Sequence, residues 1–135
     1  MKRLIALAAC CVLSACTTPG VGTGVGPSGL PACGRLPAQA RDTISLINDG
    51  GPYPYPVNDD KRFGNYEGHL PSQARNYYRE YTVDTPGVNH RGARRIVTGG
   101  GGDGVVDEWF YTDDHYETFC EISATEISAS EVEGK

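Results

Sequence analysis

Basic residues are scarce in this chain. Its 135 residues include 12 Lys and Arg against 17 Asp and Glu, so the formal net charge is −5. Proteins that bind nucleic acid through overall charge have basic surfaces, and this composition excludes that mode of binding. Any nucleic-acid site must therefore be a local cluster of cations on an acidic protein.

Large aromatic side chains other than tyrosine are also few. The chain has 3 Phe and 1 Trp, but 8 Tyr together with 18 Gly and 9 Pro. Tyrosine is common in strands and has a polar tip that suits hydrated surfaces. We expect a small, β-rich domain with a modest core and a hydrated binding surface.

The sequence has no apolar run long enough to span a membrane as a helix. Leu4 to Leu13 is apolar and uncharged but too short, and it follows Lys2 and Arg3, which is the layout of an export signal. The signal ends at Leu13-Ser14-Ala15-Cys16, which resembles the lipobox of bacterial lipoproteins. This resemblance implies that Cys16 carries lipid and anchors an extracellular or periplasmic protein in a membrane. Ordinary cleavage nearby, with free secretion, is the alternative.

The cysteines divide in agreement with export. Cys10 and Cys11 would leave with the signal, and Cys16 would carry the lipid. Cys33 and Cys120 remain, and an even pair in an oxidising compartment predicts a disulfide. Two unpaired thiols are the alternative.

Composition predicts four segments along the chain. Residues 1–16 are the signal with its lipobox, and residues 17–32 are a Gly-rich flexible tether. Residues 33–123 form the folded domain. Residues 124–135 are polar and acidic without a clear period, which predicts a disordered tail.

The domain begins with a helix and continues with strands. Apolar residues recur on one helical face over 36–51, between Pro37 in the first turn and Gly50 at the end. Strand patterns follow at 76–83, 93–98, 107–111 and 115–122, and Gly99 to Gly104 form a loop. This order predicts an α+β fold in which one N-terminal helix packs on a small antiparallel β-sheet, with the other face free for a site.

Four polar residues of these strands suit metal-independent RNA cleavage. That reaction needs a base for the substrate's 2′-OH, an acid for the leaving 5′-oxygen, and cations for the phosphoryl oxygens. Strand alternation places Arg91 and Arg95 on one side and Arg94 on the other. Glu80 and His115 supply the base and acid types. Taken singly, each has a structural explanation, such as a cross-strand ion pair or a surface histidine. No group with metal-ligand spacing is present, so we expect no metal and no cofactor.

Several blocks in one order resemble the small bacterial guanyl-specific ribonucleases, the group that includes barnase. They are Asn65-Tyr66-Glu67, Leu70-Pro71, Tyr78-Arg79-Glu80-Tyr81, Thr85-Pro86-Gly87, Arg91-Gly92-Ala93-Arg94-Arg95-Ile96 and Asp114-His115-Tyr116. The resemblance covers Leu36 to Ile122, nearly all of the expected domain, and it implies the microbial ribonuclease fold.

The resemblance also implies roles for individual residues. Glu80 matches the general base and His115 the general acid, while Arg91 and Arg95 match arginines that bind the phosphate, and Tyr116 matches a tyrosine that contacts it. The implied reaction cleaves single-stranded RNA after guanosine by transesterification to a 2′,3′-cyclic phosphate, which is then hydrolysed to a 3′-phosphate.

The resemblance also implies that the segment before the tyrosine-rich strand selects guanine. Guanine presents an N1–H and a 2-amino group side by side, and one carboxylate accepts from both. Glu67 matches the family's guanine-binding carboxylate, Phe63 is placed to stack on the base, and the backbone around Asn65 and Tyr66 meets its oxygen. Tyr66 and Gly64 depart from the family pattern, which has Arg and a larger polar residue at these positions.

Other functions remain open from the sequence. One is a non-catalytic surface lipoprotein that binds nucleotides or a protein. Another is the same nuclease deployed as a secreted toxin, with a barstar-like inhibitor protein as its partner. A third, suggested by the Gly-rich segment and the tyrosines, is an adhesive structural lipoprotein. The expected substrate partner is single-stranded RNA, and the expected oligomeric state is a monomer.

Overall fold

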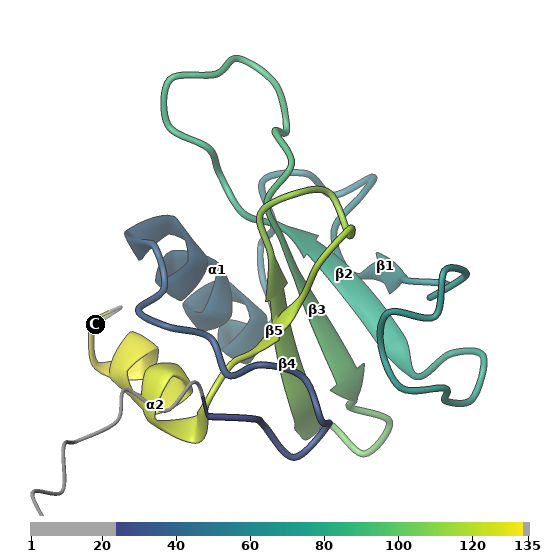
Figure 1. Cartoon of the computed structure of the whole chain (residues 1–135). Helices are drawn as coiled ribbons and strands as arrows, with labels where there is room; N and C mark the ends of the chain where they lie inside the picture. Colours follow the sequence, from purple (N-terminus) through teal and green to yellow (C-terminus); the bar gives the residue numbers. More distant parts are fainter. Residues whose placement is uncertain (1–23, 134–135) are drawn as a thin grey trace, which may run out of the picture.

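A single antiparallel sheet forms the centre of the molecule, and two helices lie beside it (Figure 1). The computed structural model describes residues 24–133. The strands follow one another in sequence order across the sheet. The elements are α1 (Ala38–Asp49), β1 (Lys61–Arg62), β2 (Tyr78–Thr82), β3 (Arg95–Gly100), β4 (Val106–Thr112), β5 (Cys120–Glu121) and α2 (Ala124–Glu133). Within residues 24–133, neither helix has the length and apolar character needed to cross a bilayer. The α+β prediction is confirmed.

Helix α1 forms where its apolar spacing predicts. Ala40, Ile44 and Ile47 are buried on one face of it. Pro37 stands just before the first turn, where its missing N–H costs nothing. Gly50 ends the helix with a φ of 77° and donates its backbone N–H to the carbonyl of Ile47. Glycine adopts this left-handed conformation without a Cβ penalty.

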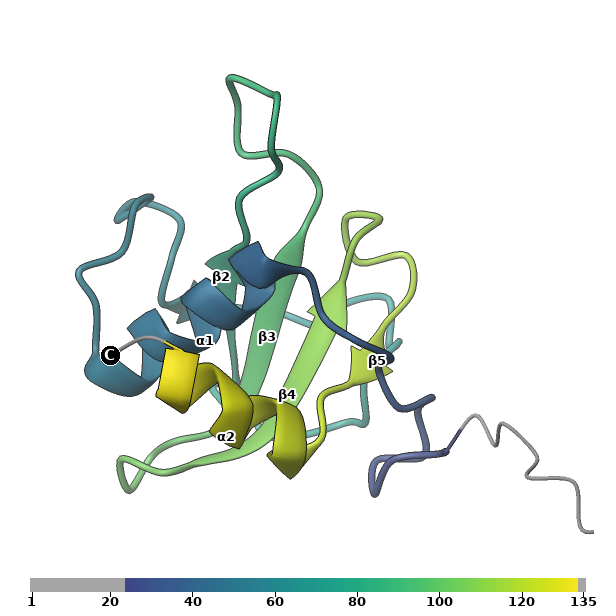
Figure 2. The same ribbon diagram turned by 90° about the vertical axis from the view of Figure 1, so that its left-hand side faces the viewer.

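The two faces of the sheet have separate apolar clusters. Tyr81, Ile96 and Tyr111 are register partners across β2, β3 and β4 and pack toward α1. Residues one position away alternate to the other face, where Val97 and Phe110 pack in a second cluster. α1 covers the first face (Figure 2). The second face is therefore the one that can carry a site.

The predicted disulfide between Cys33 and Cys120 is present and joins the N-terminal segment to β5. Residues 24–32 belong to the segment predicted to be a flexible tether, but they fold against the domain. Val25 and Pro31 form a bridge, and the buried carboxylate of Glu121 accepts hydrogen bonds from the N–H and the hydroxyl of Ser28. A buried carboxylate needs such donors, and this fixes the segment. The signal, Cys16 and residues 17–23 lie outside the described residues.

The predicted disordered tail is wrong for residues 124–133, which form α2. This helix lies alongside α1 (Figure 2). The Ser45 hydroxyl donates to the carbonyl of Ser130 at 2.8 Å, and Arg41 pairs with Glu133 at 2.7 Å. Contacts with α1 thus stabilise a helix whose own amphipathic pattern is weak.

Strand boundaries differ from the prediction at two site residues. β3 begins at Arg95, so Arg91 lies in the preceding loop, and β5 is confined to Cys120–Glu121, so His115 lies in the β4–β5 loop. His115 and Tyr116 have φ values of 56° and 73°, which no strand accommodates.

The glycine-rich loop is also shorter than predicted, because Gly99 and Gly100 belong to β3. A Cβ on Gly99 would lie 2.6 Å from Cε1 of Tyr77. The strand therefore requires glycine at this close approach.

Candidate active site

Glu80 and Arg95 lie on the face of the sheet opposite α1. Glu80 is paired with Val97, and Arg95 with Thr82. Since Glu80 and Thr82 are two residues apart on β2, they point to the same face. The central strands thus bring a carboxylate and a guanidinium group together on one face.

Backbone carbonyls of the loop before β3 fix the Arg95 side chain. The side chain is almost fully buried, and Nη1 donates to the carbonyls of Gly92 at 3.0 Å and Arg94 at 2.7 Å. Its Nε is buried and has no hydrogen-bond partner within residues 24–133. A buried, charged donor without a partner is costly, and its position on this face suits an anionic ligand.

Arg91 reaches the same place from the loop. Its Nε donates to the Thr82 hydroxyl at 3.0 Å, and its guanidinium lies 5.9 Å from the centre of the Tyr55 ring. Asp59, itself buried, accepts hydrogen bonds from both the N–H and the hydroxyl of Thr82, each at 2.7 Å. Asp59 and Thr82 were not predicted from the sequence; together they orient Arg91.

Nη2 of Arg91 is a second buried donor that lacks a partner among the described residues. Burial is the main cause of a lowered pKa of the Arg95 guanidinium, and the nearby positive charge of Arg91 is the second cause. Two cations this close repel each other unless an anion lies between them. The pair therefore forms the local cation cluster that an acidic protein needs for phosphate.

Glu80 is half-buried beside these arginines. Burial raises its pKa above the ordinary value, while Arg91 and Arg95 act in the opposite direction. Its Oε2 accepts a hydrogen bond from the Tyr116 hydroxyl. A carboxylate with a raised pKa is a better proton acceptor than a fully solvated one.

The β4–β5 loop carries His115 and Tyr116 to this face. Asp114 shapes it, accepting hydrogen bonds from the backbone and hydroxyl of Thr118 at 2.9 and 2.6 Å and from the Thr112 hydroxyl at 2.8 Å. The bonds from Thr118 are the main cause of a lowered Asp114 pKa. The backbone N–H of His115 donates to the carbonyl of Ala93, which ties this loop to the arginine loop.

Tyr116 connects the predicted site residues. Its ring stacks on Phe63 with centroids 4.9 Å apart, and the guanidinium of Arg95 lies 5.9 Å from its centre. The His115 ring lies 4.9 Å from it on another side. The Tyr116 hydroxyl also donates to Glu80. Tyr116 therefore lies next to the carboxylate, to the Arg95 guanidinium, to the His115 imidazole and to the Phe63 ring.

The loop after β1 carries the residues expected to contact a base. Asn65 has a φ of 49°, and its side chain donates to the carbonyl of Leu70 at 2.9 Å and accepts from the N–H of Leu70 at 3.1 Å. The Asn65 side chain therefore fixes the curved backbone, and Glu67 projects from it into solvent.

The two departures from the family pattern fit one another. The Tyr66 ring folds across Gly64, where an added Cβ would lie 2.2 Å from Cε2 of Tyr66. Arg62 lies 5.7 Å from the centre of this ring and donates to its hydroxyl at 3.1 Å. Tyr66 is 86% exposed, so the pair Gly64 and Tyr66 places an aromatic ring at the rim.

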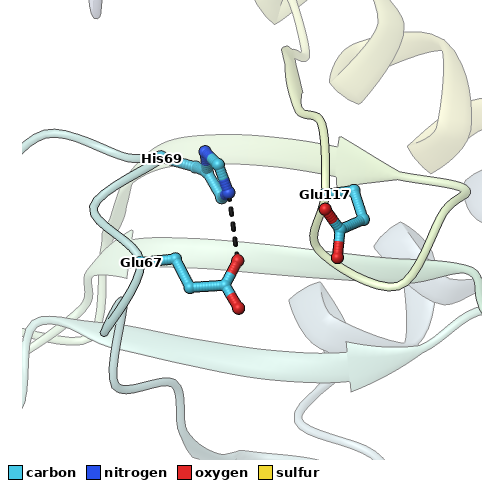
Figure 3. A group of neighbouring side chains, drawn as sticks. All are labelled: Glu67, His69 and Glu117. Carbon is cyan, nitrogen blue, oxygen red and sulfur yellow. Dashed lines mark hydrogen bonds and ion pairs between the residues drawn. The ribbon is translucent and has the colours of Figure 1, made fainter.

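A pocket of about 210 Å³ lies between the two loops. It is lined by Phe63, Asn65, Tyr66, Glu67, His69, His115, Tyr116 and Glu117. The structure thus joins the predicted base-contacting residues to His115 and Tyr116. His69 and Glu117, which face Glu67 (Figure 3), were not predicted from the sequence.

Known proteins are similar to this chain in sequence and fold. The family model described as ribonuclease matches residues 32–123. The chain belongs to the ribonuclease family. Guanyl-specific ribonuclease St from Saccharopolyspora erythraea is 57% identical over 84 residues, covering 62% of this chain and 77% of that protein. Guanyl-specific ribonuclease Sa from Kitasatospora aureofaciens is 47% identical over 98 residues, covering 73% and 97%.

Solved structures match this ribonuclease as well. A structure of ribonuclease Sa2 in complex with mononucleotides is 50% identical, with a TM-score of 0.60, and the match covers 67% of this chain and 88% of that one. The microbial ribonuclease fold predicted from the sequence is confirmed.

Proposed function

We propose that this ribonuclease cuts single-stranded RNA after guanosine, forming a 2′,3′-cyclic phosphate and then a 3′-phosphate. The observation that carries the proposal is the gathering of Glu80, Arg95 and His115 around Tyr116 beside the pocket that Glu67 lines. The positive charge of Arg91 lies near Glu80 and Arg95. The guanyl-specific relatives support the choice of base.

Glu80 and His115 act as the acid–base pair in this proposal. The Glu80 carboxylate takes the proton of the 2′-OH, whose oxygen attacks phosphorus. The bond from phosphorus to the 5′-oxygen breaks as His115 protonates that oxygen. In the second step a water molecule attacks the cyclic phosphate, with His115 taking its proton and Glu80 returning one to the 2′-oxygen.

Arg91 and Arg95 bind the phosphoryl oxygens. The two buried donors that lack partners, Nη2 of Arg91 and Nε of Arg95, are the atoms best suited to this role. Because they are fixed before the substrate arrives, they stabilise the charge that grows in the transition state without reorganisation. Tyr116, which already bonds to Glu80, exchanges that bond for one to the phosphate.

Guanine binds in the pocket between the loops. Glu67 accepts from N1–H and the 2-amino group, while Phe63 stacks on the ring. The Phe63 face is now covered by Tyr116, so Tyr116 shifts when the base enters. The backbone around Asn65 and Tyr66 completes the contact to the base oxygen.

The deciding experiment is digestion of a defined oligonucleotide by residues 24–135, with the products identified by mass. We expect cuts after guanosine and an early cyclic-phosphate product, both unchanged by a metal chelator. Cuts after every base, or no cuts, would contradict the proposal. The second outcome would support the alternative of a non-catalytic nucleotide- or protein-binding lipoprotein.

We further propose that the protein is exported and held at a membrane through lipid on Cys16. The disulfide between Cys33 and Cys120 supports export, because such bonds persist in oxidising compartments. The mass of the mature N-terminal peptide tests this: an acylated Cys16 is expected, and an unmodified N-terminus after cleavage elsewhere would indicate free secretion. A barstar-like inhibitor would cover the cleft, and elution as a monomer is expected for the free protein.

A further inference from the structure

The side chains of Glu67, His69 and Glu117 converge at the mouth of the base pocket (Figure 3). Nε2 of His69 lies 3.1 Å from Oε2 of Glu67. One ligand-type atom from each of the three residues lies within 4.8 Å of the other two. Glu117 comes from the β4–β5 loop and the other two from the loop after β1, so the fold alone brings them together.

The mechanism above leaves this group partly unexplained. Glu67 has a proposed partner in guanine, but His69 and Glu117 have no part in proton transfer or phosphate binding. The carboxylates of Glu67 and Glu117 lie close enough to repel each other, and the imidazole of His69 contacts Glu67 at 3.1 Å. A cation bound by all three would relieve this repulsion.

We propose that Glu67, His69 and Glu117 bind a zinc-type divalent transition-metal ion, and that this ion competes with guanine for Glu67. Imidazole nitrogen and carboxylate oxygen are both zinc ligands, and three protein ligands with an open fourth position is the coordination that catalytic zinc sites have. The imidazole favours such ions over Mg²⁺, which prefers oxygen ligands and retains its water.

The distances allow the ion to bind with small side-chain movements. Bond lengths of about 2.0–2.2 Å place tetrahedral ligand atoms roughly 3.4 Å apart. The pair His69 and Glu67 already has a separation of 3.1 Å. All three side chains are exposed, so Glu117 can close the remaining gap by rotation, and weak, reversible binding is expected.

Because the inference rests on the proposed guanine-binding role of Glu67, binding and activity are tested separately. Calorimetry with zinc chloride uses residues 24–135, which lack Cys10, Cys11 and Cys16, themselves zinc ligands. We expect one binding site, weakened at least about tenfold in His69→Ala and in Glu117→Gln. Glu131→Gln, at an exposed position of α2, is the matched control and should bind as the parent does. No binding up to ~1 mM zinc, or equal affinity in all variants, would overturn the proposal.

Kinetics on a guanylyl dinucleotide then test the competition. Zinc should raise KM and leave kcat unchanged in the parent protein, with Mg²⁺ having no such effect. Each variant is compared with itself in the absence of metal, and His69→Ala should lose the zinc effect. A fall in kcat with unchanged KM would place zinc at the acid–base pair and overturn the proposal. Failure to cleave without metal would instead contradict the proposed function.

Discussion

The phosphate side and the base side of this cleft are built in different ways. Glu80 and Arg95 stand on adjacent central strands, and Arg95 is 2% exposed. Glu67, on the base side, stands on an exposed loop beside the left-handed residue Asn65. His115, the proposed acid, is also exposed and left-handed, and it reaches the phosphate side from the β4–β5 loop. Phosphate binding therefore rests on buried groups anchored at the sheet, whereas base selection and the proposed acid rest on loop residues held in place by hydrogen bonds of the Asn65 and Asp114 side chains.

This comparison predicts the largest losses on the phosphate side. His115→Ala and Glu80→Ala should each lower kcat by about 10²–10⁴-fold, because each removes one proton-transfer group. His115 is exposed, so its variant should remain folded. Initial rates on a guanylyl dinucleotide measure the effect, with Glu131→Gln as the control. Turnover close to the parent's in either folded variant would remove that residue from its role.

The disulfide should affect stability more than selectivity. It closes a separation of 87 residues, and replacing both cysteines with alanine should lower the free energy of unfolding by about 2–4 kcal/mol. Urea unfolding followed by fluorescence measures the loss. An altered choice of base in the double variant would mean that the bond also shapes the base loop, contrary to expectation.

Glu67→Gln should act on the base side alone. A carboxylate that accepts from two guanine donors contributes roughly 1–3 kcal/mol of discrimination, so the preference for guanine over adenine should fall by about 10–100-fold. The ratio of kcat/KM for guanylyl and adenylyl dinucleotides measures it. If kcat/KM falls equally for both dinucleotides, Glu67 does not select the base.

The smallest expected effect is a change of stability with pH. Burial raises the pKa of Glu80 in the folded state, so the ionised carboxylate destabilises the protein at neutral pH. Below the unfolded pKa of about 4.3, both states bind the proton and the penalty disappears. Glu80→Gln should therefore raise Tm at pH 7. The gain in Tm should shrink as the pH falls through the raised pKa of folded Glu80 toward the unfolded pKa. Calorimetric scans across pH would contradict this if the gain grew on acidification.

The parts of the molecule that follow a regular period were predictable. The strand patterns locate β2 and β3, which carry Glu80 and Arg95, and the 3.6-residue period locates α1. Alternation placed Arg91 beside Arg95 on the assumption of a regular strand, but β3 begins at Arg95 and Arg91 lies in the preceding loop. The roles of Arg91 and His115, both on loops where no period applies, were implied by the family resemblance. Helix α2 was not predicted, because its packing on α1, rather than an amphipathic pattern of its own, stabilises it.

Other features needed three-dimensional proximity. Asp59 meets Thr82 from a turn-rich segment with no recognisable motif. Glu117 joins Glu67 and His69 only because the fold brings the β4–β5 loop close to the loop after β1. The sequence showed Gly64 and Tyr66 as two separate departures from the family pattern. The structure links them, because the Tyr66 ring occupies the space that a side chain at position 64 would need.

Both described ends of the chain lie on the helix side, remote from the β1 loop (Figure 1). Gly24 accepts a hydrogen bond from the N–H of Ala32, which forms a bridge with Glu121 of β5. α2 ends beside α1, where Glu133 pairs with Arg41. A bead, a resin or a lipid leaflet coupled through either end would thus leave the cleft turned to the medium. Immobilised preparations should digest long transcripts as readily as the free protein does.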